Sequence, residues 1–181
     1  MSAFLRRQLT DYVEYHRNPV NCALHVFGIV ILFLGAILPL SLLPVTVFGL
    51  QINMGVLLAL PVLIYWIMLD VTIGLAIAAA AALLLFTGAT IASHASVTVV
   101  LAITVVLIVI GVALQIIGHQ VFERRQPALI DNPTHLLLGP VFVMAKLFIS
   151  LGFRHDLAAI IQQGPNSTYQ HQSQGGVQQD R

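Results

Sequence analysis

The hydrophobic positions of this chain fall into long runs that are almost free of charged residues. Four runs, at about 24–43, 52–69, 71–91 and 97–117, approach or exceed the roughly 20 apolar residues that a helix needs to cross a bilayer. Between Arg17 and Glu123, Asp70 is the one charged residue, leaving His uncounted. A water-soluble fold of this size could not hide so much apolar sequence. The pattern predicts an all-α, polytopic membrane bundle of about four transmembrane helices.

Two further segments are predicted to lie at the membrane boundary. Residues 3–16 show apolar side chains at helical spacing and predict an amphipathic helix in the headgroup plane. Residues 136–151 are apolar but short and interrupted by Gly139-Pro140, so we expect a re-entrant or interfacial helix. Residues 1–161 then form a single membrane domain, and the Gln/Gly/Ser-rich residues 162–181 are expected to be a disordered tail.

Basic residues predict the orientation. Arg6, Arg7 and Arg17 precede the first span, and Arg124 and Arg125 follow the fourth. The turns on the other side of the membrane contain no Lys or Arg. With an even number of spans, the positive-inside rule puts the N-terminus and Asp70 in the cytoplasm and His94 on the opposite side. A bacterial inner membrane is favoured, with the endoplasmic reticulum expected if the source is eukaryotic.

Composition excludes several classes of protein. Hydrophobic residues make up 58% of the chain and charged residues 8%, and the net charge is +1, which argues against nucleic-acid binding. The single cysteine, Cys22, cannot form an internal disulfide framework. The sequence has no motif for phosphate binding or for serine hydrolysis. We expect membrane lipid to surround the helix bundle.

Histidines are the informative polar residues. Four of the seven map to the predicted cytoplasmic boundary: His16, His25, His119 and His135. The first two flank a corner at Asn18-Pro19, with His25 expected in the first turn of its span. Glu123 follows His119 by four residues and would share its helix face. Imidazoles with a carboxylate suit non-heme iron and also zinc. The alternative is four separate interfacial histidines, each hydrogen-bonded locally.

Other polar residues keep two interpretations. Asp70 would either orient a histidine N–H or cap the turn between the second and third spans. Arg124 would either set the topology or bind a lipid carboxylate. Arg17 and Asn21, beside the corner, are further candidates for substrate binding.

Two other functions fit a small bundle. A transporter would use Asp70 and the histidines as a proton relay, but its polar residues should follow a path through the bilayer rather than gather on one side. A non-catalytic scaffold would hold zinc or no metal and would pack through small residues such as Gly74 and Ala76.

Three blocks of the sequence resemble the Mpo1-like membrane proteins over about residues 5–150. They are Tyr12…His16…Asn18-Pro19…Asn21…His25…Gly28, then Gly118-His119…Phe122-Glu123…Pro127-Ala128, then His135…Gly139-Pro140…Phe142. The resemblance implies an iron(II)-dependent dioxygenase that shortens long-chain 2-hydroxy fatty acids by one carbon with O2, releasing CO2, in sphingolipid breakdown. It implies Fe(2+) ligands among His16, His25, His119 and His135. Glu123 follows as a ligand or as a group that supports one.

Overall fold

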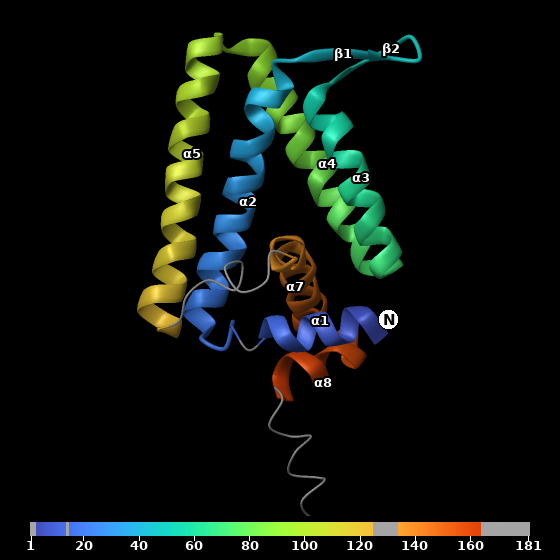
Figure 1. Ribbon diagram of the computed structural model, residues 1–181, viewed down its shortest axis with the longest axis vertical. Helices are drawn as coiled ribbons and strands as arrows, with labels where there is room; N and C mark the ends of the chain where they lie inside the picture. The colour runs from blue at the N-terminus through green and yellow to red at the C-terminus, as the bar shows by residue number, and fades with distance from the viewer. Residues whose placement is uncertain (1–2, 14, 125–133, 164–181) are drawn as a thin grey trace, which may run out of the picture.

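Four apolar helices run side by side along the long axis of the molecule, and three further helices gather at one end (Figure 1). The computed structural model describes residues 3–13, 15–124 and 134–163. The long-axis helices are α2 (Pro19–Ser41), α3 (Met54–Leu69), α4 (Val71–His94) and α5 (Val97–Ile117). The helices gathered at one end are α1 (Ala3–Val13), α7 (His135–Ser150) and α8 (His155–Gln163). The all-α prediction is confirmed.

Three helices in the described part of the chain are long and apolar enough to cross a membrane. These are α2 with 23 residues, α4 with 24, and α5 with its continuation η1 (Gly118–Glu123), which together have 27. Large apolar side chains such as Phe27, Leu83 and Val105 are more than 60% exposed along their outer faces. A large apolar surface of this kind is stable in contact with lipid but not with water, as is typical of a membrane helix bundle.

The predicted second span is shorter than expected. Its first residue, Ile52, belongs to a hairpin of β1 (Pro44–Val47) and β2 (Leu50–Asn53), where only a turn was expected. Asn53 then caps α3 by accepting a hydrogen bond from the backbone N–H of Val56. The 16 residues of α3 extend about 24 Å, less than the roughly 30 Å of a bilayer core. A complete crossing by α3 stays a prediction.

The remaining bounds differ by a few residues. The first span begins at Pro19 rather than at 24 and ends at Ser41, because Asn18 caps it and proline is well placed at a helix start. The third extends to His94. Helices α3 and α4 form the expected tight hairpin, with Asp70 alone between them. A Cβ on Gly74 would collide with the backbone of Trp66 and Ile67, so glycine allows this close approach.

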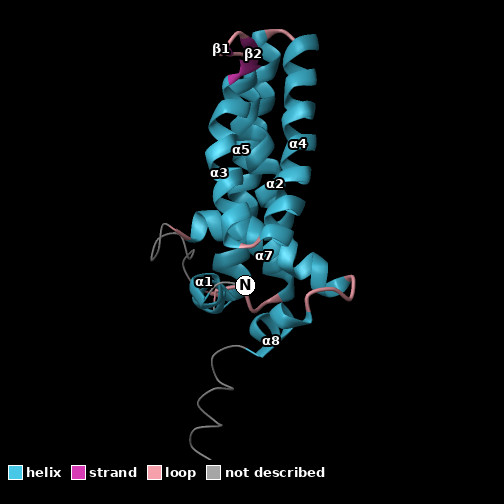
Figure 2. Ribbon diagram, turned by 90° about the vertical axis from the view of Figure 1, so that its right-hand side faces the viewer, coloured by secondary structure: helices cyan, strands magenta, loops and turns pink. Residues whose placement is uncertain are grey.

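Helix α1 buries its apolar face against α7 and α8, and its position in the headgroup plane stays a prediction. It ends at Val13 rather than at 16, and Leu5 and Leu9 are completely buried in a cluster that includes Leu138 of α7 and Leu157 of α8. The apolar face that predicted a membrane-surface helix therefore packs on protein. Figure 2 shows α1, α7 and α8 together at one end of the bundle.

Helix α7 is continuous through Gly139-Pro140, where an interruption was expected. It is seen nearly end-on in Figure 1 while α2 and α5 lie along the long axis, so it crosses the bundle at a steep angle. Its 16 residues are too few to span a bilayer upright. Helix α8 was not predicted. It includes residues 162 and 163 of the expected tail, and the rest of that tail lies outside the described residues.

Candidate metal centre

The corner between α1 and α2 positions His16. Its ring stacks on Tyr12, with centroids 4.1 Å apart, and its Nδ1–H donates to the Tyr12 carbonyl at 3.0 Å. Two residues later the side chain of Asn18 accepts from the backbone N–H of Val20 at 2.8 Å and starts α2. Contacts with Tyr12 therefore hold the buried His16 ring just before the residue that caps α2.

His25 lies in the second turn of α2 rather than in the first, because the helix begins earlier than predicted. Its Nδ1–H donates to the carbonyl of Asn21 at 3.2 Å, the same arrangement as in His16. A carbonyl can only accept, so Nδ1 carries the proton in both rings. In the neutral imidazoles, Nε2 therefore keeps its lone pair, as a metal ligand must.

His119 belongs to η1, a single turn of π-helix at the end of α5 that was not predicted. Such turns are rare and occur often at functional sites. A Cβ on the preceding Gly118 would collide with Oδ1 of Asn21, so only glycine lets η1 approach α2 this closely. The approach brings the buried His119 ring to His25.

The three rings converge. Their centroids lie 4.5 Å apart for His16–His25, 4.7 Å for His25–His119 and 5.1 Å for His16–His119. One ring nitrogen from each lies within 4.8 Å of the others. Nε2 of His16 and Nδ1 of His119 are buried and lack a hydrogen-bond partner in the described structure. Buried imidazole nitrogens without partners are costly unless something binds them, and a metal ion fits this set.

Electrostatics also suits metal binding. Burial, and after it the nearby charge of His25, lowers the pKa of His16 to about 3. His16 is therefore neutral at physiological pH and available as a ligand. Three neutral nitrogens leave coordination positions open for substrate, which suits non-heme iron and zinc alike.

His135 lies beside this set rather than in it. It is buried at the start of α7 and makes edge contacts with the rings of Tyr12 and Tyr15, at 5.6 and 5.8 Å. It lines the same cavity as the other three histidines. Of the four predicted ligands, the structure brings three into mutual reach and places the fourth on the adjoining wall.

Glu123 supports the site from behind. Its Oε1 accepts from the backbone N–H of Asn18 at 2.7 Å and from Nδ2 of Asn21 at 3.1 Å. These bonds join η1, which carries His119, to the corner between His16 and His25. Asn21 was expected to bind substrate, but it is completely buried behind the site and does not line the cavity.

Asp70 caps the start of α4, which is the second of its two predicted roles. Its carboxylate accepts from the backbone N–H of Ile73 at 3.1 Å and from both Nη atoms of Arg154 at 2.9 Å. Burial raises the pKa of Asp70, but the hydrogen bonds from Arg154 and Ile73 outweigh it and leave that pKa lowered. The α3–α4 junction lies across the bundle from η1 in Figure 1, so Asp70 does not orient a site histidine.

The two candidate arginines lie outside the cavity wall. Arg17 is exposed next to His16, and Arg124 is exposed with a left-handed φ of 53° where η1 ends. Neither lines the cavity. Arg125 lies outside the described residues. His94, at the other end of α4, is exposed and bonds locally to Thr90.

A cavity of about 280 Å³ opens at the three rings. Its wall is histidine and tyrosine at one end and aliphatic elsewhere, with one amide: Tyr12, His16, His25, Ile29, Leu32, Val112, Gln115, Ile116, His119, His135, Leu136 and Gly139. Gln115 was given no role from the sequence, although it precedes His119 by one helical turn. That spacing, which places Gln115 on the same helix face as His119, could have indicated a role at the site. The cavity combines a polar head with a long apolar wall.

Comparisons with known proteins identify the family of this chain. A family model described as "2-hydroxy-palmitic acid dioxygenase Mpo1-like" matches residues 2–151. The chain is 35% identical over 160 residues to a Saccharomyces cerevisiae protein named 2-hydroxy-palmitic acid dioxygenase MPO1, covering 87% of each chain. No solved structure matches.

Proposed function

Since this chain belongs to the Mpo1-like family of 2-hydroxy-palmitic acid dioxygenases, we propose that it oxidises long-chain 2-hydroxy fatty acids with O2 in a membrane. The proposed products are the fatty acid one carbon shorter, CO2 and water. Atoms and electrons balance in this reaction, because losing the carboxyl carbon and oxidising the carbinol removes the four electrons that O2 takes up. No further reductant is needed.

The observation that supports this proposal is the convergence of His16, His25 and His119 at the head of an apolar cavity. We propose that these three residues hold iron(II). When bound there, the metal would supply a chelation site for the 2-hydroxy acid and the redox chemistry of O2. The assignment of His135 as a fourth ligand stays a prediction.

The protein's own groups prepare the site before any ligand binds. The carbonyls of Tyr12 and Asn21 hold two rings in the required tautomer. Glu123 keeps the two ligand-bearing segments together. Preorganised donors lose little entropy on binding, which favours both metal affinity and orientation of the reactants.

Substrate orientation follows from the cavity wall. The hydroxyl and carboxylate of a 2-hydroxy acid would lie at the histidine end, within reach of the Gln115 amide, and the alkyl tail would lie along Ile29 and Leu32. None of the described residues that line the cavity is a cation. Arg17 and Arg124 could therefore attract the carboxylate only from outside the wall, and their part in binding stays a prediction, as does the cytoplasmic orientation of the site.

The test uses purified protein prepared without oxygen and loaded with iron(II). On addition of 2-hydroxypalmitate and O2, oxygen uptake should match formation of pentadecanoate and CO2 one for one. His119→Ala should abolish turnover and metal retention. His94→Ala is the matched control, because His94 is exposed on α4 and bonded only locally in the described structure, and this variant should behave as the unmodified protein.

Two results would overturn the proposal. One is the absence of iron-dependent turnover with any 2-hydroxy acid. The other is full activity in His119→Ala. Stoichiometric zinc without oxygen uptake would instead favour the non-catalytic scaffold.

A further inference from the structure

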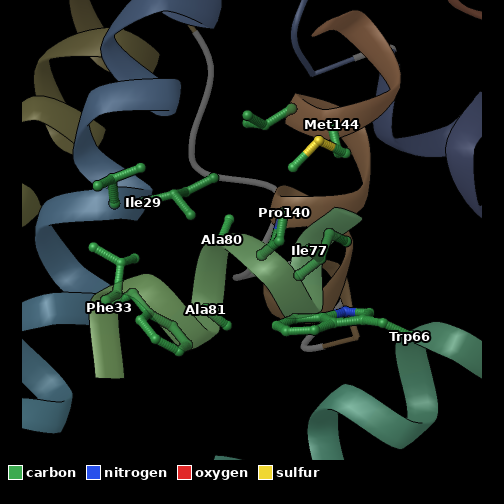
Figure 3. A pocket seen from close by; sticks show the side chains of 11 residues that line it. Ile29, Phe33, Trp66, Ile77, Ala80, Ala81, Pro140 and Met144 are labelled. Carbon is green, nitrogen blue, oxygen red and sulfur yellow. The ribbon is translucent and has the colours of Figure 1, made fainter. Parts of the chain in front are cut away.

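Two more apolar cavities continue from the histidine cavity along α2. The middle cavity, of about 90 Å³, lies between α2, α4 and α7 and is shown in Figure 3. The upper cavity, of about 160 Å³, lies between α2 and α3. Every described residue that lines either of them is apolar or is Trp66, whose Nε1–H is already bonded to the carbonyl of Leu137 at 2.7 Å.

Shared residues separate the three cavities. Ile29 lines both the histidine cavity and the middle cavity. It is held against α7, where a Cβ on Gly139 would come within 2.8 Å of Ile29 Cδ1. Phe33 and Trp66 line both the middle and the upper cavity. The shared side chains therefore stand at the boundaries between the cavities, and Gly139 and Pro140 of α7 adjoin the first boundary.

The partitions follow one face of α2. His25, Ile29 and Phe33 are spaced four residues apart, and Ile37 and Leu40 of the upper cavity continue the same stripe. Along the helix axis, Phe33 is about 12 Å and Leu40 about 22 Å from His25. One leaflet of a bilayer core, which a long acyl chain fills, is about 15 Å deep. A long tail that starts at the histidines would thus pass Phe33 and end in the upper cavity.

We propose that the three cavities form one path for the alkyl tail of the substrate, with Ile29 and the Phe33–Trp66 pair as the side chains that it must displace. This inference rests on the proposed function for the identity of the tail. A tail drawn from lipid gains little by entering another apolar space. The path therefore selects chain length by steric exclusion, because a tail longer than the open path must overpack it.

Trp66 reports the position of the tail without turnover. It is the single tryptophan of the chain and is 4% exposed, so surrounding lipid is kept from its ring. The probe is 2-hydroxypalmitate brominated either at its terminal carbon or next to the 2-hydroxy carbon, added without oxygen to the protein in bilayers. Terminal bromine should quench Trp66 several-fold more strongly. Equal quenching by the two acids, or quenching equal to that from brominated phospholipid, would overturn the proposal.

Two blocking variants test the same path by competition between 2-hydroxyoctanoate and 2-hydroxypalmitate. Ile29→Phe should lower kcat/KM for 2-hydroxypalmitate about 5- to 150-fold relative to 2-hydroxyoctanoate, which corresponds to the usual cost of overpacking. Ala59→Phe, in the upper cavity, should lower the turnover of 2-hydroxypalmitate but leave the turnover of the shorter 2-hydroxylaurate unchanged. Ala82→Phe is the control, because Ala82 is exposed on α4 and lines none of the three cavities. Losses that are equal for all chain lengths would contradict the path.

The two proposals fail separately. Position-dependent quenching without turnover of any 2-hydroxy acid would support the tail path and overturn the proposed dioxygenase activity. Iron-dependent turnover without position-dependent quenching would retain the dioxygenase and place the tail in the bilayer.

Discussion

Glu123→Ala tests whether one carboxylate holds the metal site together. In the native protein, Oε1 of Glu123 accepts two hydrogen bonds, from Asn18 and Asn21, at 2.7 and 3.1 Å. A hydrogen bond to a charged group contributes about 1.5–3 kcal/mol. Because Glu123 is partly exposed and water can replace part of this, we expect the variant to lose about 2–3 kcal/mol of unfolding free energy. Glu123→Gln keeps an acceptor oxygen but no charge, and should lose about 1 kcal/mol.

The same change should weaken metal binding. The two bonds fix the segment that contains His16 and His25 relative to the turn that contains His119. Loss of a group that orients ligands typically lowers metal affinity about 10- to 100-fold. Affinity is measured with cobalt(II) as a spectroscopic probe in competition with a chelator, and stability by thermal unfolding in detergent.

Asp11→Ala is the matched control, because Asp11 is an exposed carboxylate on α1. It should change stability by less than about 0.5 kcal/mol and leave cobalt affinity unaltered. Native cobalt affinity in Glu123→Ala would refute the positioning role. A loss in Glu123→Gln as large as that in His119→Ala would instead make the carboxylate a direct ligand.

The other predictions concern packing, pH and metal linkage. Gly118→Ala should cost about 1–3 kcal/mol and reduce metal retention, because its Cβ would collide with Asn21; thermal unfolding with metal analysis checks this. Asp70→Asn should cost about 1–3 kcal/mol at neutral pH by weakening the Arg154 pair. Since the pKa of Asp70 is lowered in the folded protein, its contribution is present above the unfolded-state pKa of about 4 and is lost as pH falls through the lower folded value. Unfolding curves of native protein and variant should therefore converge in acid, and a gap that persists there would contradict the ion pair. Cobalt(II) at about 100 times its dissociation constant should stabilise the native protein by about 2.7 kcal/mol and leave His16→Ala unaffected.

The apolar runs predicted most of the helices because a membrane removes the usual ambiguity. In lipid, every backbone group must be satisfied within its segment, so a long apolar run becomes a helix whatever its neighbours do. The bounds were less certain because capping decides them. Asn18 and Asn53 end the preceding segments and start α2 and α3 at points that hydropathy does not mark.

Three features depend on contacts between distant segments and could not be read from local pattern. The π-turn at Gly118 exists where α5 meets α2, and its widened turn directs His119 toward His25. The face of α1 looked like a membrane-surface helix because apolar periodicity is the same whether lipid or protein covers it. Arg154 pairs with Asp70 across 84 residues, which fixes Asp70 as a cap rather than as part of the site.

By itself, the sequence predicted an all-α membrane bundle, with most of its polar residues near one end and four histidines as the candidate site. The tertiary structure decided which histidines meet: His16, His25 and His119 lie within reach of one ion, and His135 lies beside them. It also placed three separate cavities along α2. Hydropathy is a property of each segment in its solvent, whereas a ligand set depends on helix crossings that glycines such as Gly118 permit. A few ångströms of helix separation, set by packing, decide whether three imidazoles can hold one ion.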